Sequence, residues 1–99
     1  MDNQQQIDAA VFQKLLSHLN DHKEVQNIDL MILADFCRNC LAQWMVTAAE
    51  DVGVSLDYEV ARERVYGMPY SQWKEQFQAK ASSEQMAAFN AKQQAKNTQ

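Results

Sequence analysis

The strongest constraint on the fold is a helical pattern of apolar residues that extends from Ile28 to about Asp51. If this segment is placed on a helix, its apolar residues gather along one side and most polar residues lie on the other. The apolar side holds Leu30, Leu33, Ala34, Cys37, Cys40, Leu41, Trp44, Met45 and Ala48. The pattern predicts one long central helix over about 28–51, with Asn27 as its N-cap and Trp44 largely buried.

Shorter patterns and helix-end signals predict further helices on both sides of this segment. Residues 8–22 carry an apolar stripe at helical spacing. Ser55 is placed to cap a helix that ends at Gly67, and Pro69 suits the first position of the next helix. Residues 82–85 have the spacing of a capping box, which predicts a last helix after them.

The composition supports an all-α fold. The chain has 99 residues with only two glycines and one proline, which leaves little material for the turns of an all-β protein. A chain of this length forms one domain. We therefore expect a single all-α domain over residues 1–99, with an ordered core of about 8–91 and frayed polar termini. Four to five helices should pack around the long central helix over about 28–51.

Charge and hydropathy limit the kinds of partner that the protein can bind and indicate its cellular compartment. Nine basic and thirteen acidic residues give a net charge of −4, and no basic stripe is present for nucleic acid or an anionic membrane. The first six residues are polar, whereas a signal peptide begins with basic and then apolar residues. The longest apolar run, 30–34, is far too short to span a membrane. These features predict a cytoplasmic protein with reduced cysteines.

Cys37 and Cys40 are the two cysteines of the chain and form a CxxC motif on the predicted helix. Zinc is bound by such thiolates together with histidines, and His18 and His22 lie on the preceding predicted helix. In an antiparallel hairpin, however, His18 is offset from Cys37 by about five residues, and His22 by more. A closed four-ligand site within the hairpin is therefore not expected. A zinc site at the two cysteines that another segment or a second chain completes, with His18 as a further candidate ligand, stays open.

The thiols have two other interpretations. A redox-active CxxC is placed where a helix begins, so that the helix N-terminus stabilises the thiolate. The predicted helix instead puts Cys37 about nine residues inside, beyond the reach of the helix dipole. Because Cys37 and Cys40 both fall on the apolar side, the favoured interpretation is that they pack in the core as small apolar residues.

Two polar residues and an aromatic corner are further site candidates. Arg38 and Asn39 lie on the predicted polar side, where Arg38 could bind a carboxylate or phosphate, or pair with Asp35. If the chain turns back after Gly53, residues 66–70 come opposite about residues 38–42. The predicted pocket is lined by Arg38, Asn39 and Tyr66, beside Cys37 and Cys40, with Tyr70 and Trp73 as its wall. Aromatic residues at such a turn also serve simply to close a core.

Three apolar residues interrupt the predicted polar side of the central helix. They are Ile32, Phe36 and Val46. A domain of this size has few layers with which to cover them, so they predict a homodimer or another protein partner.

Three separated segments carry a resemblance to a known family. They are residues 25–31 (VQNIDLM), 36–41 (FCRNCL) and 65–70 (VYGMPY), the last followed by Trp73 and Lys74. In this order they resemble a small bacterial family described as domain of unknown function 1244, over roughly residues 8–90.

The resemblance implies a stand-alone, helical, cytoplasmic protein and supplies no activity. It marks the FCRNC segment (36–40) and the YGMPY segment (66–70) as the best site candidates. The chain departs from the family pattern at Met45, because a tyrosine usually follows the tryptophan that Trp44 matches. His18 matches the pattern, whereas His22 has no counterpart, which weakens a histidine-based metal site.

These observations favour a small cytoplasmic binding or assembly module over an enzyme. The alternative is a zinc-binding or thiol-dependent protein that uses Cys37 and Cys40.

Overall fold

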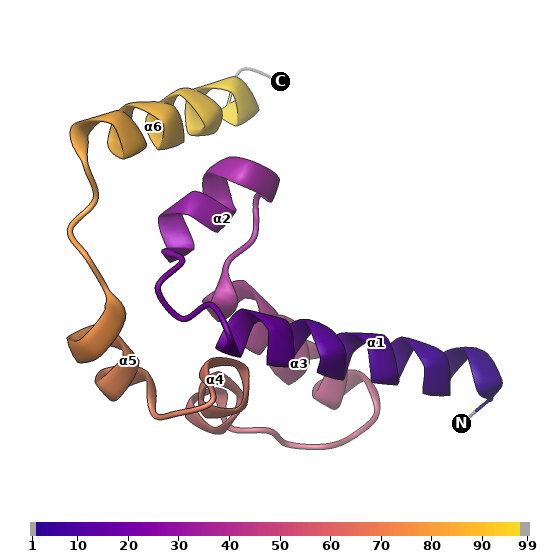
Figure 1. The fold of residues 1–99 in the computed structure, drawn as a ribbon. Helices are drawn as coiled ribbons and strands as arrows, with labels where there is room; N and C mark the ends of the chain where they lie inside the picture. Colours follow the sequence, from indigo (N-terminus) through magenta and orange to yellow (C-terminus); the bar gives the residue numbers. More distant parts are fainter. Residues whose placement is uncertain (1, 98–99) are drawn as a thin grey trace.

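The computed structural model describes residues 2–97, which form six helices and no strand (Figure 1). The helices are α1 (Asn3–Asn20), α2 (Asn27–Ala34), α3 (Arg38–Asp51), α4 (Tyr58–Tyr66), α5 (Tyr70–Phe77) and α6 (Ser83–Asn97). The all-α prediction is therefore confirmed for this part of the chain, although the helices number six instead of four to five.

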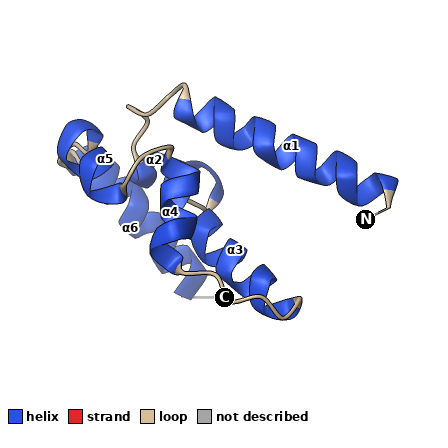
Figure 2. Ribbon diagram, turned by 90° about the horizontal axis from the view of Figure 1, so that it is seen from below, coloured by secondary structure: helices blue, strands red, loops and turns tan. Residues whose placement is uncertain are grey.

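Helix α4 is the centre of the packing, because α1, α3 and α5 all contact it. Helix α6 packs against α2 at another edge of the molecule (Figure 1). The N-terminal half of α1 extends away from the other helices (Figure 2). The buried core consists of Leu16, Leu19, Leu30, Leu41, Ala42, Ala61, Val65, Tyr66 and Trp73. The helices thus pack around α4 and not around the segment 28–51.

The long helix predicted over about 28–51 is wrong, because the chain breaks between α2 and α3. Asp35 ends α2 in the left-handed conformation, with φ 60° and ψ 29°. Aspartate is one of the few residues other than glycine that adopt this conformation readily. Its carboxylate lies 3.5 Å from the Lys92 Nζ and 3.4 Å from the Lys96 Nζ of α6. The break therefore occurs at a corner that is stabilised by contacts with α6.

The break also explains why the predicted burial of Trp44 is wrong. Once α3 begins afresh at Arg38, it turns Leu41 and Ala42 into the core against α4. Trp44 then lies on the outer side of α3 and is 56% exposed. The tryptophan of the core is Trp73, which is 1% exposed.

Most of the helix ends that were predicted from the sequence agree with the structure. Gly67 ends α4 with φ 70°, and Pro69 precedes α5 directly. The capping box over 82–85 is formed, because the Ser82 Oγ accepts from the Gln85 N–H at 3.0 Å and the Gln85 Oε1 accepts from the Ser82 N–H at 2.7 Å. The start of α4 differs from the prediction, since Asp57 caps it in place of Ser55.

The three apolar residues that predicted self-association are not a free apolar face. Phe36 and Val46 pack against the core. Ile32 lies on α2 and is partly buried, and its carbonyl oxygen accepts a hydrogen bond from the Lys92 Nζ of α6 at 2.6 Å. Self-association stays a prediction, but the exposed apolar side of a central helix that motivated it is not present among the described helices. Within residues 2–97, no helix combines the length and apolar character needed to cross a membrane.

The two glycines offer a test of the turn that precedes α5. Gly67 and Gly53 both have positive φ, 70° and 77°, but a Cβ on Gly67 would lie 2.9 Å from the Asn20 Oδ1, whereas a Cβ on Gly53 meets nothing within 4 Å. We expect Gly53→Ala to lower the free energy of unfolding by about 1 kcal/mol through backbone strain, and Gly67→Ala by about 2 kcal/mol because Asn20 must also move. Urea denaturation measures both changes. Equal losses in the two variants would contradict the close approach to Asn20.

Candidate functional site

The FCRNC and YGMPY segments meet at Tyr66, which is fully buried at the end of α4. The Tyr66 hydroxyl donates to the Asn39 Oδ1 at 2.7 Å and accepts from the Asn27 Nδ2 at 3.0 Å. Burial raises the pKa of Tyr66, so the phenol stays neutral and keeps the proton that it donates to Asn39. The predicted meeting of the two segments is therefore observed, with Asn39 as the point of contact.

Arg38 is not the ligand-binding residue that its predicted polar position suggested. It is 1% exposed, and its guanidinium donates to the carbonyl oxygens of Val25 at 2.7 Å and His22 at 3.0 Å and to the Asn27 Oδ1 at 3.1 Å. It also lies 5.3 Å from the centre of the Trp73 ring. Burial lowers the pKa of Arg38. The predicted alternative, a pair with Asp35, is not formed either, since Asp35 faces the lysines of α6.

Asn27 connects the partners of this cluster. Its Oδ1 accepts from the backbone N–H of Arg38 at 3.2 Å, in addition to the guanidinium, and its Nδ2 binds Tyr66. The side chain thus satisfies the first N–H of α3, although the sequence predicted it as the N-cap of the helix over 28–51. Gln26 is the residue that precedes α2. The one sequence signal for Asn27 as a site residue was its place in the 25–31 segment of the resemblance.

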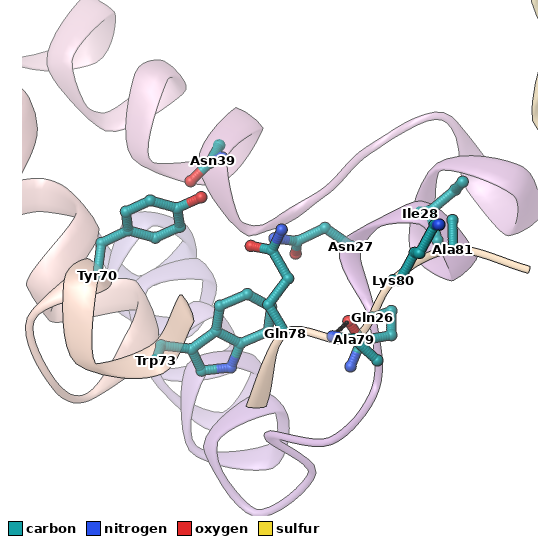
Figure 3. A pocket seen from close by; sticks show the side chains of 10 residues that line it. All are labelled: Gln26, Asn27, Ile28, Asn39, Tyr70, Trp73, Gln78, Ala79, Lys80 and Ala81. Atoms are coloured by element: carbon teal, nitrogen blue, oxygen red, sulfur yellow. Dashed lines mark hydrogen bonds between the residues drawn. The ribbon is translucent and has the colours of Figure 1, made fainter. Parts of the chain in front are cut away.

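Hydrogen bonds of the Gln26 side chain hold the loop between α5 and α6 against the start of α2. Its Nε2 donates to the carbonyl oxygen of Phe77 at 2.9 Å, and its Oε1 accepts from the N–H of Ala79 at 2.9 Å. Figure 3 shows the second of these bonds at one side of a cleft. No pattern around Gln26 indicated this role, because its partners lie more than fifty residues away.

The loop between α5 and α6 forms one side of an open cleft of about 330 Å³. The lining residues are Gln26, Asn27, Ile28, Asn39, Tyr70, Trp73, Gln78, Ala79, Lys80 and Ala81 (Figure 3). Of the predicted pocket residues, Asn39, Tyr70 and Trp73 line this cleft. Arg38 and Tyr66 are buried and do not line this cleft.

The aromatic residues form the apolar part of the cleft. The rings of Tyr70 and Trp73 are stacked, with centres 6.3 Å apart and an angle of 19° between their planes. The guanidinium of Arg62 lies 3.9 Å from the centre of the Tyr70 ring, which holds that ring in place. The hydroxyl of Tyr70 points toward Asn39 (Figure 3).

The two thiols lie at the beginning of α3 and not inside a helix. Cys37 is the N-cap residue, and Cys40 lies in the first turn, with 3.3 Å between their sulfur atoms. Both are free and partly exposed, so neither belongs to the fully buried core that was the favoured interpretation. Burial raises the pKa of the Cys37 thiol, whereas the backbone N–H groups of Cys40 and Asn39 act in the opposite direction.

The histidines do not join the thiols. His18 and His22 are exposed, and their rings lie 4.8 Å from each other on one side of α1 and the turn after it. In the part of the chain that the structure describes, no three histidine, cysteine or acidic side chains gather as metal ligands. A site that combines Cys37, Cys40 and His18 is therefore not formed. Zinc at the two cysteines would need its remaining donors from outside the chain.

Comparison with known proteins gives one finding. The family described as "Protein of unknown function (DUF1244)" matches residues 25–91, about two thirds of the chain. The match includes every residue of the cleft and both thiols, and it leaves α1 outside, whereas the resemblance was expected to begin near residue 8. No curated protein matches the chain.

Proposed function

We propose that this chain, which belongs to the DUF1244 family of proteins of unknown function, is a small helical binding module whose cleft takes a small planar polar molecule. The cleft between α2, α5 and the loop that follows α5 is the proposed binding site. Its volume of about 330 Å³ lies at the lower end of the range for small-molecule sites.

The observation that carries the proposal is the state of the Asn39 side chain. Its Oδ1 is taken by the Tyr66 hydroxyl, which Asn27 holds in turn, so the orientation of the amide is fixed. Its Nδ2 has no hydrogen-bond partner among the residues that the structure describes, and the residue lines the cleft. A donor that is held in place before a ligand arrives costs little entropy when it binds.

The other lining groups define the class of ligand. The Tyr70 hydroxyl and the Gln78 amide also lack partners within residues 2–97, and each can donate or accept. The partly exposed Tyr70 ring, which is stacked on buried Trp73, supplies an apolar wall for a flat molecule, and exposed Lys80 adds a positive charge at the rim. These groups suit a small aromatic amide or carboxylic acid.

Titration of the isotope-labelled protein with benzamide, nicotinamide and benzoate tests the proposal. We expect saturable shifts of the side-chain amide signals of Asn39 and Gln78 and of the Trp73 indole signal in nuclear magnetic resonance spectra. The indole signal of Trp44 serves as an internal reference, because Trp44 does not line the cleft. The proposal fails if none of the three compounds shifts the cleft signals, or if the Trp44 signal shifts as strongly as they do.

A paired substitution then tests the role of Asn39. Asn39→Asp keeps the oxygen that accepts from Tyr66 and replaces the unpaired donor, so we expect about tenfold weaker binding of benzamide. Asn90→Asp makes the same chemical change at an exposed position of α6 and should leave binding unchanged. Equal affinities of the two variants would show that the Asn39 donor does not contact the ligand.

A further inference from the structure

The position of the CxxC motif in the structure differs from the sequence prediction in a way that has chemical consequences. Cys37 has an extended backbone, with φ −146° and ψ 177°, directly before the 14 residues of α3. Cys40 is the third residue of that helix, and the two sulfur atoms are 3.3 Å apart. A disulfide bond is about 2.05 Å long, so small side-chain rotations bring these atoms to bonding distance.

We propose that Cys37 and Cys40 form a redox-active dithiol, and that its substrate is the disulfide of a low-molecular-weight thiol. The proposal is independent of the cleft and its ligand. Both cysteines are partly exposed, so a small disulfide can reach them. Neither sulfur is committed to a metal cluster among the described residues, and each has the other as its hydrogen-bond partner.

The helix assigns different roles to the two thiols. Cys37 precedes α3, where the backbone N–H groups of Asn39 and Cys40 face its sulfur and favour the thiolate. Burial outweighs this effect, so the assignment rests on position: Cys37 lies outside the helix with an extended backbone and is taken as the attacking thiol, and Cys40, inside the first turn, resolves the intermediate. The titratable groups that interact with Cys37 are Cys40, Arg38 and Tyr66.

The reaction takes place in two exchanges. The Cys37 thiolate attacks one sulfur of the substrate disulfide, which forms a mixed disulfide at Cys37 and releases one thiolate that takes up a proton. Cys40 then loses its proton and attacks the Cys37 sulfur, which forms the Cys37–Cys40 disulfide and releases the second thiol. In sum, two cysteine thiols and one disulfide give one intramolecular disulfide and two thiols, so the substrate is reduced by two electrons.

Burial sets the pH dependence of the first exchange. Because burial raises the pKa of the Cys37 thiol, only a small fraction is thiolate at neutral pH. The rate of attack should therefore increase with pH through the usual titration range of cysteine and continue to increase above it.

Equilibration of the full chain with mixtures of reduced and oxidised glutathione tests the proposal. After acid quenching and alkylation, mass spectrometry should detect a monomer that has lost two hydrogen atoms and takes up no alkylating reagent. Its fraction should follow the glutathione ratio reversibly. A chain that keeps both thiols in oxidised glutathione, or that forms only disulfide-linked dimers, would overturn the proposal.

Two single variants test the assignment of roles. Cys40→Ser should accumulate the mixed disulfide with glutathione at Cys37, several-fold faster than Cys37→Ser does at Cys40, and its rate should increase with pH as described. Serine is itself a favourable N-cap residue, so Cys37→Ser is expected to remain folded, which circular dichroism can verify. Equal rates in the two variants would overturn the assignment of Cys37 as the attacking thiol.

Discussion

Trp73→Ala is expected to lower the free energy of unfolding by about 3–5 kcal/mol. The Trp73 side chain is 1% exposed, and its ring lies 5.1 Å from that of Tyr66 and 5.3 Å from the Arg38 guanidinium. Its Nε1 donates to the carbonyl oxygen of Lys23 at 3.0 Å. Alanine removes this ring from the core and leaves the carbonyl without its donor, and both effects are destabilising. Urea denaturation followed by circular dichroism measures the change.

Trp44→Ala is the matched control, because it deletes the same side chain from an exposed position on α3. Since Trp44 is 56% exposed, we expect its removal to cost less than about 1 kcal/mol. The difference between the two variants reports burial, because the two substitutions are chemically identical. A larger loss for Trp44→Ala than for Trp73→Ala would contradict the break between α2 and α3.

Arg38→Ala is expected to lower the free energy of unfolding by about 4 kcal/mol, because it removes a buried side chain with its hydrogen bonds and leaves the Val25 carbonyl oxygen without its donor. The guanidinium is the donor for the carbonyl oxygens of His22 and Val25 and for the Asn27 Oδ1. A chain of this size has a total stability of about 5–15 kcal/mol, so the variant should be close to unfolding at room temperature. The urea midpoint measures the loss.

Two further substitutions separate the charge of Arg38 from its shape. Arg38→Lys keeps the charge but not the planar fork that reaches two loop carbonyls at once, so we expect a smaller but clear loss. Arg64→Ala removes an arginine from the exposed side of α4 and should change the stability by less than about 0.5 kcal/mol. If Arg38→Lys matched the original protein in stability, the fork geometry would not matter.

The parts of the fold that were predicted from the sequence depend on local physics. Gly67 ends α4 because its backbone needs a positive φ, and the capping box after Ser82 closes through bonds between residues three apart. The meeting of Tyr66 with Asn39 follows from the short connection between α3 and α4, which brings the second helix back along the first. The first two features are visible within a short stretch of sequence, and the third requires only the turn that joins two consecutive helices.

The break at Asp35 could not be predicted in the same way. The segment 28–51 has neither glycine nor proline, and most of its apolar residues remain in helical phase from one end to the other. The competing contacts are distant in sequence, since Asp35 lies beside Lys92 and Lys96 and Arg38 binds carbonyls that precede α2. Every error about Trp44, Arg38 and the cysteines follows from this one break.

Only part of the candidate site was predicted, again because some of its contacts join residues that are distant in sequence. Asn39, Tyr70 and Trp73 were found because they belong to the FCRNC segment, the YGMPY segment and the helix turn that follows. Gln26 and Asn27 were missed as site residues, because amide side chains take their roles from partners that only the folded chain supplies. For Asn27, those partners are Arg38 and Tyr66.

The bonds of Arg38 also bear on how the molecule opens locally. Because one guanidinium binds carbonyls of residues 22 and 25 and belongs to the first turn of α3, the turn that follows α1 cannot separate from α3 while these bonds hold. The turn after α1 and the start of α3 therefore form one cooperative unit for amide hydrogen exchange. Helix α6 has no buried residue over 83–96 and packs mainly against α2, so its amides exchange through a separate opening of lower free energy.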